Sequence, residues 1–170
     1  MRNPIVLLGR AISLHKHRSE RETGLTPLPK IHSVMLILDA DDKSAGKCAV
    51  AANKYFSAKG MECKVYAFCA EKEHAAVEGT TLLLKRNFNW FGRPKRSRRS
   101  PSVSFEADLF IDLTASGIYA AEYCARCCKA EFKISRKQTK DSIFNLVMES
   151  EGYGAAEVLE NLIPLMEIIK

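Results

Sequence analysis

Apolar runs of strand length alternate along the chain with segments whose apolar residues recur at helical spacing. The strand-like runs lie at residues 33–39, 62–68, 80–85, 107–114, 130–135 and 142–149. The helical patterns lie at residues 44–58, 116–129 and 154–169. Strands that alternate with helices of this length favour right-handed βαβ crossovers and a mostly parallel sheet.

The start of the chain has a different pattern. Asn3 and Pro4 form an N-cap followed by a proline in the first turn, which is a helix start signal. Apolar residues then recur at helical spacing, at Ile5, Leu8 and Ile12, before the polar stretch HKHRSERETG. We therefore expect an N-terminal helix and linker over residues 1–30. Residues 31–170 are expected to form one three-layer, doubly wound, Rossmann-like α/β domain with a sheet of five to six strands.

Composition narrows the class of protein further. Hydrophobic residues make up 46% of the chain and charged residues 27%, as in globular proteins. The apolar runs are too short to span a bilayer or to form the apolar region of a signal peptide. Six cysteines are scattered through apolar surroundings rather than arranged as a disulfide framework. We expect reduced thiols, a cytoplasmic location and no membrane partner.

Three cysteines fall close together in the stretch YCARCCKAEF. They belong to one stripe of small residues at helical spacing, Gly117, Ala120, Ala121, Cys124, Cys127 and Cys128. A structural zinc site would need a second pair of ligands, and a redox pair would lie at the start of the helix. We interpret the stripe as the buried side of a helix, with a metal or redox role as the alternative, and expect neither a metal nor another cofactor.

The acidic stretch LDADDKSAGK follows the first long strand, where open α/β sheets usually bind ligands. Asp39 and Asp41 resemble the DxD of haloacid-dehalogenase-type phosphatases, and Thr114 stands where such enzymes keep a hydroxyl after a later strand. The threonine that these enzymes place shortly after the second aspartate is missing. The alternative is a polar loop in which Asp42 or Ser44 caps the next helix.

The stretch IDLTASG offers a second candidate contact for a small molecule. Thr114 and Ser116 precede a helix whose free N–H groups could hold an anion, and Gly117 would allow close approach. The alternative is that Ser116 is an ordinary N-cap. With Asp39 and Asp41, these residues form the candidate ligand site.

A basic segment with interleaved aromatic residues lies between the third and fourth strands. Its basic residues are Lys85, Arg86, Arg93, Lys95, Arg96, Arg98 and Arg99, and its aromatic residues are Phe88, Trp90 and Phe91. These seven basic residues exceed the formal net charge of +6, so the rest of the chain is close to neutral. Aromatic stacking and phosphate neutralisation predict binding of single-stranded nucleic acid or another polyanion. The alternative is a solvated loop at 85–100 that the aromatic residues hold against the domain.

Four stretches, VMLILDADDK, NFNWFGRPK, FEADLFIDLT and CKAEFKIS, resemble a family of small uncharacterised bacterial proteins, a domain of unknown function, over nearly the whole chain. The segment DLFIDLTASGIYAAEYCARCCKAEFKIS is also similar to the amino-terminal half of heptosyltransferase-type glycosyltransferases. That likeness implies a Rossmann-like domain. The glycine-rich turn of those enzymes is replaced by DADDKSAGK, and their second, nucleotide-sugar-binding domain is missing.

Three functions remain open. Because the sequence contains no complete catalytic set, the first is a non-catalytic binding or interaction domain with a protein or polyanion partner. The second is a nucleic-acid or other polyanion binder that acts through residues 85–99. The third is a small enzyme or nucleotide-binding protein that uses the strand ends at 39–46 and 112–117; a shared scaffold alone would not identify it.

Overall fold

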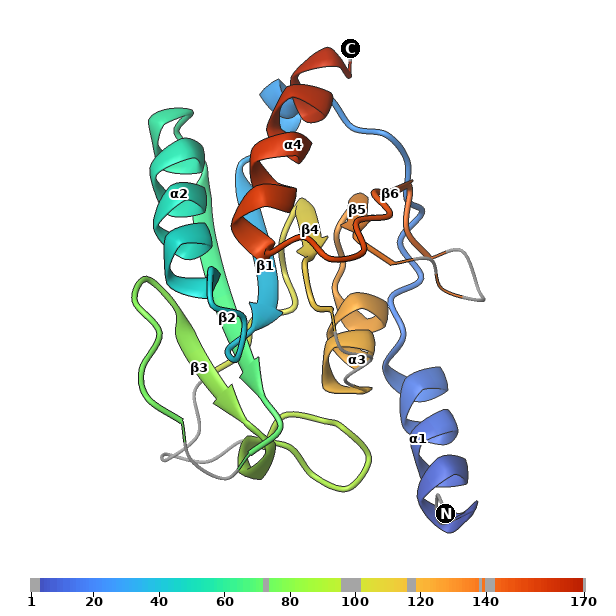
Figure 1. The fold of residues 1–170 in the computed structure, drawn as a ribbon. Helices are drawn as coiled ribbons and strands as arrows, with labels where there is room; N and C mark the ends of the chain where they lie inside the picture. The colour runs from blue at the N-terminus through green and yellow to red at the C-terminus, as the bar shows by residue number, and fades with distance from the viewer. Residues whose placement is uncertain are drawn as a thin grey trace.

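Six strands form one sheet in the order β3-β2-β1-β4-β5-β6, and every neighbouring pair is parallel (Figure 1). The strands are β1 (Ser33–Asp39), β2 (Glu62–Cys69), β3 (Thr81–Leu84), β4 (Leu109–Asp112), β5 (Phe132–Ser135) and β6 (Leu146–Val147). The computed structural model describes residues 4–71, 74–95, 102–115, 119–137, 139 and 143–169. This order is that of a doubly wound, Rossmann-like sheet, and the predicted α/β fold class is confirmed.

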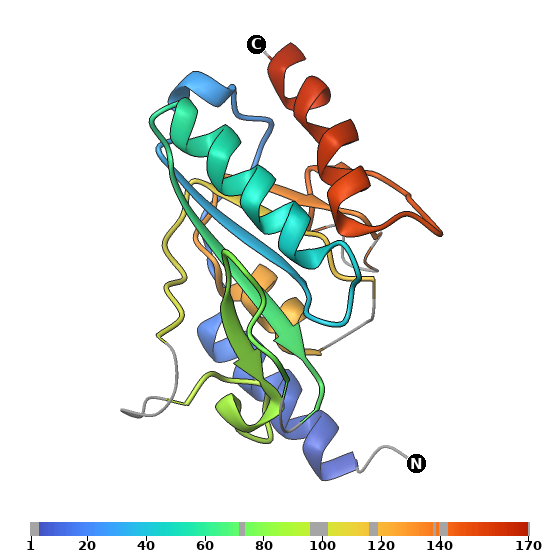
Figure 2. The ribbon, with the colours of Figure 1, turned by 60° about the vertical axis from the view of Figure 1, so that its left-hand side comes forward.

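Helices lie on both faces of the sheet (Figure 2). One face is covered by α2 (Ala45–Ala58) and α4 (Ala155–Ile168), which also contact each other. The other is covered by α3 (Tyr119–Cys127), with α1 (Pro4–His17) beside it. Two short 3-10 turns, η1 (Leu28–Lys30) and η2 (Lys85–Asn87), precede β1 and follow β3. Within the described residues, no helix is both long and apolar enough to cross a bilayer.

Side chains of the central strand β1 pack in two separate hydrophobic cores, one on each face of the sheet. Side chains alternate across a strand, so Val34, Leu36 and Leu38 pack with the α2 and α4 side. Met35 and Ile37 point to the opposite face and pack with α3. Both faces of β1 are therefore buried, which explains why its sequence is a continuous apolar run rather than an alternating one.

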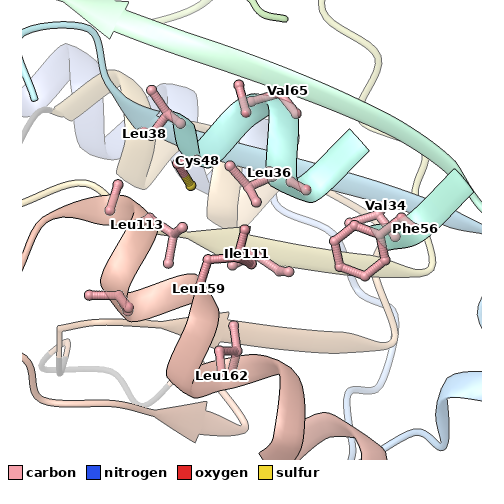
Figure 3. Packing of buried hydrophobic residues seen from close by; sticks show 14 of the residues in the cluster. Val34, Leu36, Leu38, Cys48, Phe56, Val65, Ile111, Leu113, Leu159 and Leu162 are labelled. Atoms are coloured by element: carbon pink, nitrogen blue, oxygen red, sulfur yellow. The ribbon is translucent and has the colours of Figure 1, made fainter. Parts of the chain in front are cut away.

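The first core is built from small residues on α2 and larger ones on α4 (Figure 3). Cys48 and Phe56 project from α2 toward Leu36 and Val34, while Leu159 and Leu162 of α4 lie near the β4 side chain of Ile111 (Figure 3). The buried residues of α2 are Ala45, Cys48, Ala49, Ala52 and Phe56. This is the helical face that the sequence predicts, and small side chains let α2 approach the sheet closely.

The second core contains the cysteine stripe. Cys124 and Cys128 are fully buried between α3 and the sheet, and Cys127 is 7% exposed. Burial raises the pKa of the Cys124 thiol well above its ordinary value, because the apolar surroundings disfavour the thiolate. All six cysteines are free thiols. The interpretation of this stripe as a buried side is confirmed from Ala121 to Cys128; Ala120 is half-buried, and Gly117 lies outside the described residues.

The first helix differs from its predicted form in two ways. It continues through the polar residues to His17, where three basic residues in its last turn suit the negative end of the helix dipole. Its apolar residues also point to solvent, with Ile5 76% exposed and Leu8 63% exposed. The helix instead contacts the domain through Arg10, whose guanidinium stacks on the Tyr119 ring and whose carbonyl accepts a hydrogen bond from the Tyr119 hydroxyl.

The last strand is shorter than its apolar run. The sequence predicts a strand over 142–149, but among the described residues 143–149 the strand covers only Leu146 and Val147. The flanking Asn145 and Met148 N–H groups also donate hydrogen bonds to β5, at 2.8 and 2.9 Å. β6 lies at the edge of the sheet, and the β5 strand that it pairs with offers only four residues.

Candidate functional site

The carboxyl ends of all six strands lie at one edge of the sheet, because the strands are parallel. The neighbouring strands β1 and β4 lead into helices on opposite faces, α2 after β1 and α3 after β4. A sheet with this reversal binds ligands at the carboxyl ends of the two strands concerned. The acidic residues after β1 and the start of the basic segment after β3 therefore lie at the same edge.

Two buried carboxylates meet at the ends of β1 and β4. Asp39 and Asp112 are each 9% exposed. Asp39 accepts a hydrogen bond of 2.7 Å from the Ala115 N–H, and Asp112 accepts bonds from the Thr114 N–H at 2.9 Å and hydroxyl at 2.7 Å. The structure thus brings Asp39 and Thr114, two residues of the predicted site, to one place. Ser116 and Gly117 lie outside the described residues.

Asp112 lies within the predicted strand end 112–117 but was not among the residues predicted to contact a ligand. Burial raises the pKa of its carboxyl group to about 6, and the charge of Asp39 acts in the same direction, whereas the Thr114 hydrogen bonds and the Lys137 charge oppose the rise. A buried carboxyl group with a raised pKa is a common feature of binding and catalytic sites. The signal in the sequence was a carboxylate at the end of the most apolar strand, in FIDLT.

The loop after β1 holds the beginning of α4. Asp42 accepts a hydrogen bond of 2.9 Å from the Ala155 N–H, and the Ser44 hydroxyl accepts one of 3.1 Å from the Ala156 N–H. Ser44 occupies the N-cap position of α2, as one of the two alternatives expected, but its side chain makes no capping bond to that helix. The N-cap residue of α4 is Gly154, which has no side chain of its own to do so.

Asp41 has different neighbours from Asp39. Its side chain is 62% exposed and lies 3.2 Å from the Nε2 atom of His74. The Sγ atom of Cys69, at the end of β2, lies 4.0 Å from the same carboxylate oxygen. The structure therefore places the two aspartates of the DxD pattern in separate groups, Asp39 with the end of β4 and Asp41 with the end of β2.

The basic segment begins with an ordered turn. Phe88 is buried and its ring lies 5.6 Å from that of Phe68, which attaches the turn to the second core. A bridge joins Phe88 to Pro94, and the Asn89 side chain accepts hydrogen bonds from the backbone N–H groups of Phe91 and Arg93. The turn shown at the bottom of Figure 1 is thus held by its own backbone and by one buried ring.

The turn also contacts α1 and α3 closely. A methyl group added at Gly9 of α1 would collide with the Phe91 ring. Gly92 has a φ of 75°, and a side chain there would collide with the Tyr119 ring of α3. The guanidinium of Arg10 donates a 3.4 Å hydrogen bond to the Trp90 carbonyl. Phe88 therefore packs as the alternative prediction expected. Phe91 contacts α1 but is 41% exposed, and the Trp90 side chain is 78% exposed.

Basic residues lie on both sides of Trp90 in the sequence. Lys85, Arg86, Arg93 and Lys95 are all exposed. In the described part of the chain, no carboxylate forms an ion pair with any of these four. The other predicted contacts, Arg96, Arg98 and Arg99, lie outside the described residues. The ordered turn presents the Trp90 indole, part of the Phe91 ring and four cationic groups to solvent.

A family model matches residues 10–169, almost the whole chain. The chain belongs to a family of unknown function (DUF6913). No curated protein and no solved structure matches it. The matched region of this DUF6913 member contains the whole sheet, the carboxylates after β1 and the basic turn, so all the candidate contacts above lie within the part that defines the family.

This family member also has an open hollow of about 460 Å³, away from the carboxyl edge. It lies between α2 and the starts of β2 and β3, and its lining includes Asn53, Lys64 and Thr81. Its position beside the first residues of these strands separates it from Asp39 and Trp90. The hollow is therefore no part of the candidate site.

Proposed function

We propose that this chain is a non-catalytic binding domain that binds single-stranded nucleic acid or another polyanion through the segment 85–99. The observation that carries this proposal is the exposed indole of Trp90, 78% accessible, on an ordered turn among exposed basic side chains. Phe88 of the same turn is buried and Phe91 contacts α1, so Trp90 is the most exposed of the three rings.

The chemistry of the turn suits a single strand. A nucleobase can stack on an exposed indole and gain roughly 1–3 kcal/mol, while lysine and arginine side chains neutralise the phosphates. If all seven basic residues of the segment contact phosphates, log K should fall with log salt with a slope of about −5. Because stacking reads only the face of a base, little sequence preference is expected.

The tryptophan provides the assay, since it is the only one in the chain. Its fluorescence would be followed while oligo(dT) or oligo(U) is added at low and at physiological salt. We expect quenching and a steep salt dependence in the wild type. Affinity should fall at least 10-fold at low salt in Arg93→Gln/Lys95→Gln, measured by anisotropy of labelled oligonucleotide, because two phosphate contacts are lost.

A matched control is available at the other end of the sheet. Lys30 and Lys54 are exposed lysines outside the segment, so Lys30→Gln/Lys54→Gln removes the same charge. If both double variants lower the oligonucleotide affinity equally, the attraction depends on net charge only, and the proposal is contradicted. Binding to anionic lipid vesicles without oligonucleotide binding would instead assign the turn, with the exposed apolar residues of α1, to a lipid surface.

A second candidate function rests on the carboxylates at the ends of β1 and β4. The buried pair Asp39 and Asp112, beside the Thr114 hydroxyl, supports a small-molecule site at the reversal point of the sheet. Several carboxylates would repel a free phosphate, so the ligand should be cationic or bridged by a divalent cation. Turnover in a hydrolase or transferase screen that is lost in Asp39→Asn would establish this function and contradict a purely non-catalytic domain.

The source and the cellular compartment of the protein are also part of the proposal. We infer a bacterial, cytoplasmic protein, supported by the sequence likeness quoted above and by the six free thiols. The likeness to heptosyltransferase-type glycosyltransferases supports a shared Rossmann-like scaffold only. Residues 1–30 are taken as an N-terminal helix and linker attached to an α/β domain over 31–170.

A further inference from the structure

We propose that Asp41, Cys69 and His74 form a binding site for one transition-metal ion of the Zn²⁺ class at the carboxyl ends of β1 and β2. One oxygen, one sulfur and one nitrogen atom of these residues all lie within 4.8 Å of one another. The proposal is independent of the nucleic-acid function, because none of the three residues belongs to the segment 85–99.

The sheet brings the first two residues together. β1 and β2 pair in register up to Asp39 and Phe68, and the Ala40 N–H continues the pairing with a 2.7 Å bond to the Phe68 carbonyl. The residue after Ala40 therefore lies beside the residue after Phe68. These are Asp41 and Cys69, whose Oδ1 and Sγ atoms are 4.0 Å apart.

The loop after β2 supplies the third residue. His74 lies beside the end of β1, with its Nε2 atom 3.2 Å from Asp41 Oδ1. The other ring nitrogen, Nδ1, lies 2.7 Å from the Ala75 carbonyl oxygen. A carbonyl oxygen only accepts hydrogen bonds, so Nδ1 suits the role of donor to Ala75, and Nε2 is the ring nitrogen left to bind a metal ion beside Asp41. Metal-binding histidines are commonly held in this way, with the second nitrogen donating to a backbone carbonyl.

The cysteine is placed to act as a thiolate ligand. Cys69 is 3% exposed, and the Glu71 N–H donates a 3.4 Å bond to its sulfur. A backbone N–H pointed at sulfur stabilises a negative charge there. Cys128 also receives backbone hydrogen bonds at its sulfur, from Ala130 and Ala107, but it is fully buried in the second core. Burial raises the pKa of the Cys48 and Cys63 thiols to about 12.

The donor set selects the class of metal. Thiolate and imidazole are poor ligands for Mg²⁺ and Ca²⁺ but good ones for Zn²⁺ and Co²⁺. Bond lengths of about 2.0–2.3 Å place the ligand atoms of a tetrahedral zinc site about 3.3–3.8 Å apart. The Asp41–His74 distance of 3.2 Å is already close to that, and a rotation of the exposed Asp41 side chain would shorten its 4.0 Å separation from sulfur. The His74 nitrogen and the Cys69 sulfur lie within 4.8 Å of each other, so His74 must also move slightly to close the site.

Three protein ligands leave one position of a tetrahedral ion open. Asp41 is the most exposed of the three, at 62%, while the His74 side chain is 23% exposed, so the open position faces solvent at the Asp41 side. Zinc sites with three protein ligands hold water or a ligand group in the fourth position. Such an ion would offset the negative charge at the acidic end of the carboxyl edge and give it a point of attachment for an anion.

The test uses Co²⁺, because its absorption reports both geometry and the presence of sulfur. The full chain, freed of metal with a chelator, would be titrated with Co²⁺ and then with Zn²⁺ in competition. We expect one equivalent to produce the visible bands of a tetrahedral ion together with a thiolate charge-transfer band in the near ultraviolet. Zn²⁺ should displace it.

Two variants and a matched control locate the ion. His74→Ala should weaken binding about 100-fold or more, since losing a group that merely orients a ligand already costs roughly 10- to 100-fold. Cys69→Ser should lose the charge-transfer band, and Cys63→Ser, at the other end of β2, should keep it. Circular dichroism in chelator would show that each variant is folded; if Cys69→Ser is not, His74→Ala still decides.

Two results would overturn the proposal. Equal Co²⁺ affinity in the wild type and His74→Ala would mean that any bound metal lies elsewhere. If the wild type shows no thiolate-to-Co²⁺ charge-transfer band, Cys69 is not a ligand, and the three residues contain only the Asp41–His74 contact. Oligonucleotide binding would be measured separately with chelator present, so failure of the metal site and failure of the nucleic-acid function remain distinguishable.

Discussion

Replacing Asp112 with asparagine should stabilise the fold at neutral pH. The buried carboxyl group is ionised there at a cost, because it has lost solvent and faces the charge of Asp39. Asparagine keeps an oxygen that can accept the bonds from the Thr114 N–H and hydroxyl, but carries no charge. The substitution thus removes the cost while keeping the local turn.

The magnitude follows from the pKa in the two states. Asp112 titrates near 6 in the folded protein and near its ordinary value of 3.8 when unfolded. A difference of about two in pKa corresponds to about 3 kcal/mol. Because the folded pKa is raised, the full stability is present below pH 3.8, and it declines as pH rises to about 6. At pH 5 ionisation of Asp112 lowers the free energy of unfolding by about half of the full amount, and above about pH 7 by all of it.

Urea unfolding of wild type and Asp112→Asn at pH 5 and pH 8 would measure this cost. We expect Asp112→Asn to gain about 1–1.5 kcal/mol more at pH 8 than at pH 5, relative to the wild type. Glu151→Gln, at an exposed carboxylate, serves as the control and should show no such difference. The reasoning is refuted if the free-energy difference between Asp112→Asn and the wild type is the same at both pH values.

Three further substitutions test the packing and the helix start. Asp42→Ala removes the acceptor of the Ala155 N–H and should cost about 1–2 kcal/mol in urea unfolding at pH 7. Burial opposes ionisation of Asp42, but its hydrogen bonds outweigh that effect and lower its pKa below the ordinary value of 3.8. The stability that the ionised carboxylate contributes is therefore fully present above pH 3.8 and is lost as the pH falls through the lowered pKa. Gly92→Ala combines a φ of 75° with a collision against Tyr119 and should lower stability by more than about 1 kcal/mol; a neutral result in thermal unfolding would show that the turn shifts freely. Leu159→Ala, fully buried in the first core, should cost about 2–5 kcal/mol, and a loss under about 1 kcal/mol would contradict the packing of α4 on the sheet.

The candidate contacts were predictable where they depend on local chemistry. A carboxylate directly after an apolar strand identified Asp39 and Asp41, and a hydroxyl after another strand identified Thr114. Asp112 was missed because it lies inside an apolar run rather than after it. Cys69 and His74 were missed because one ends a strand and the other lies in a loop, with no spacing typical of metal ligands.

The periodicity of apolar residues was enough to predict the helices, the strands and the parallel sheet, since burial on both faces produces continuous apolar runs. The same periodicity predicted that the cysteine stripe is buried. These are properties of a segment and its nearest neighbours along the chain.

Other features depend on segments that are distant in sequence and meet only in the folded chain. Asp42 and Ser44 cap α4, more than 100 positions away, rather than the helix that follows them. Trp90 is 78% exposed while Phe88 is buried and Phe91, 41% exposed, contacts α1, because the core and α1 lie on one side of the turn. A hydrogen bond or a burial site is set by whichever group is nearest in space, and the order of residues does not record that distance.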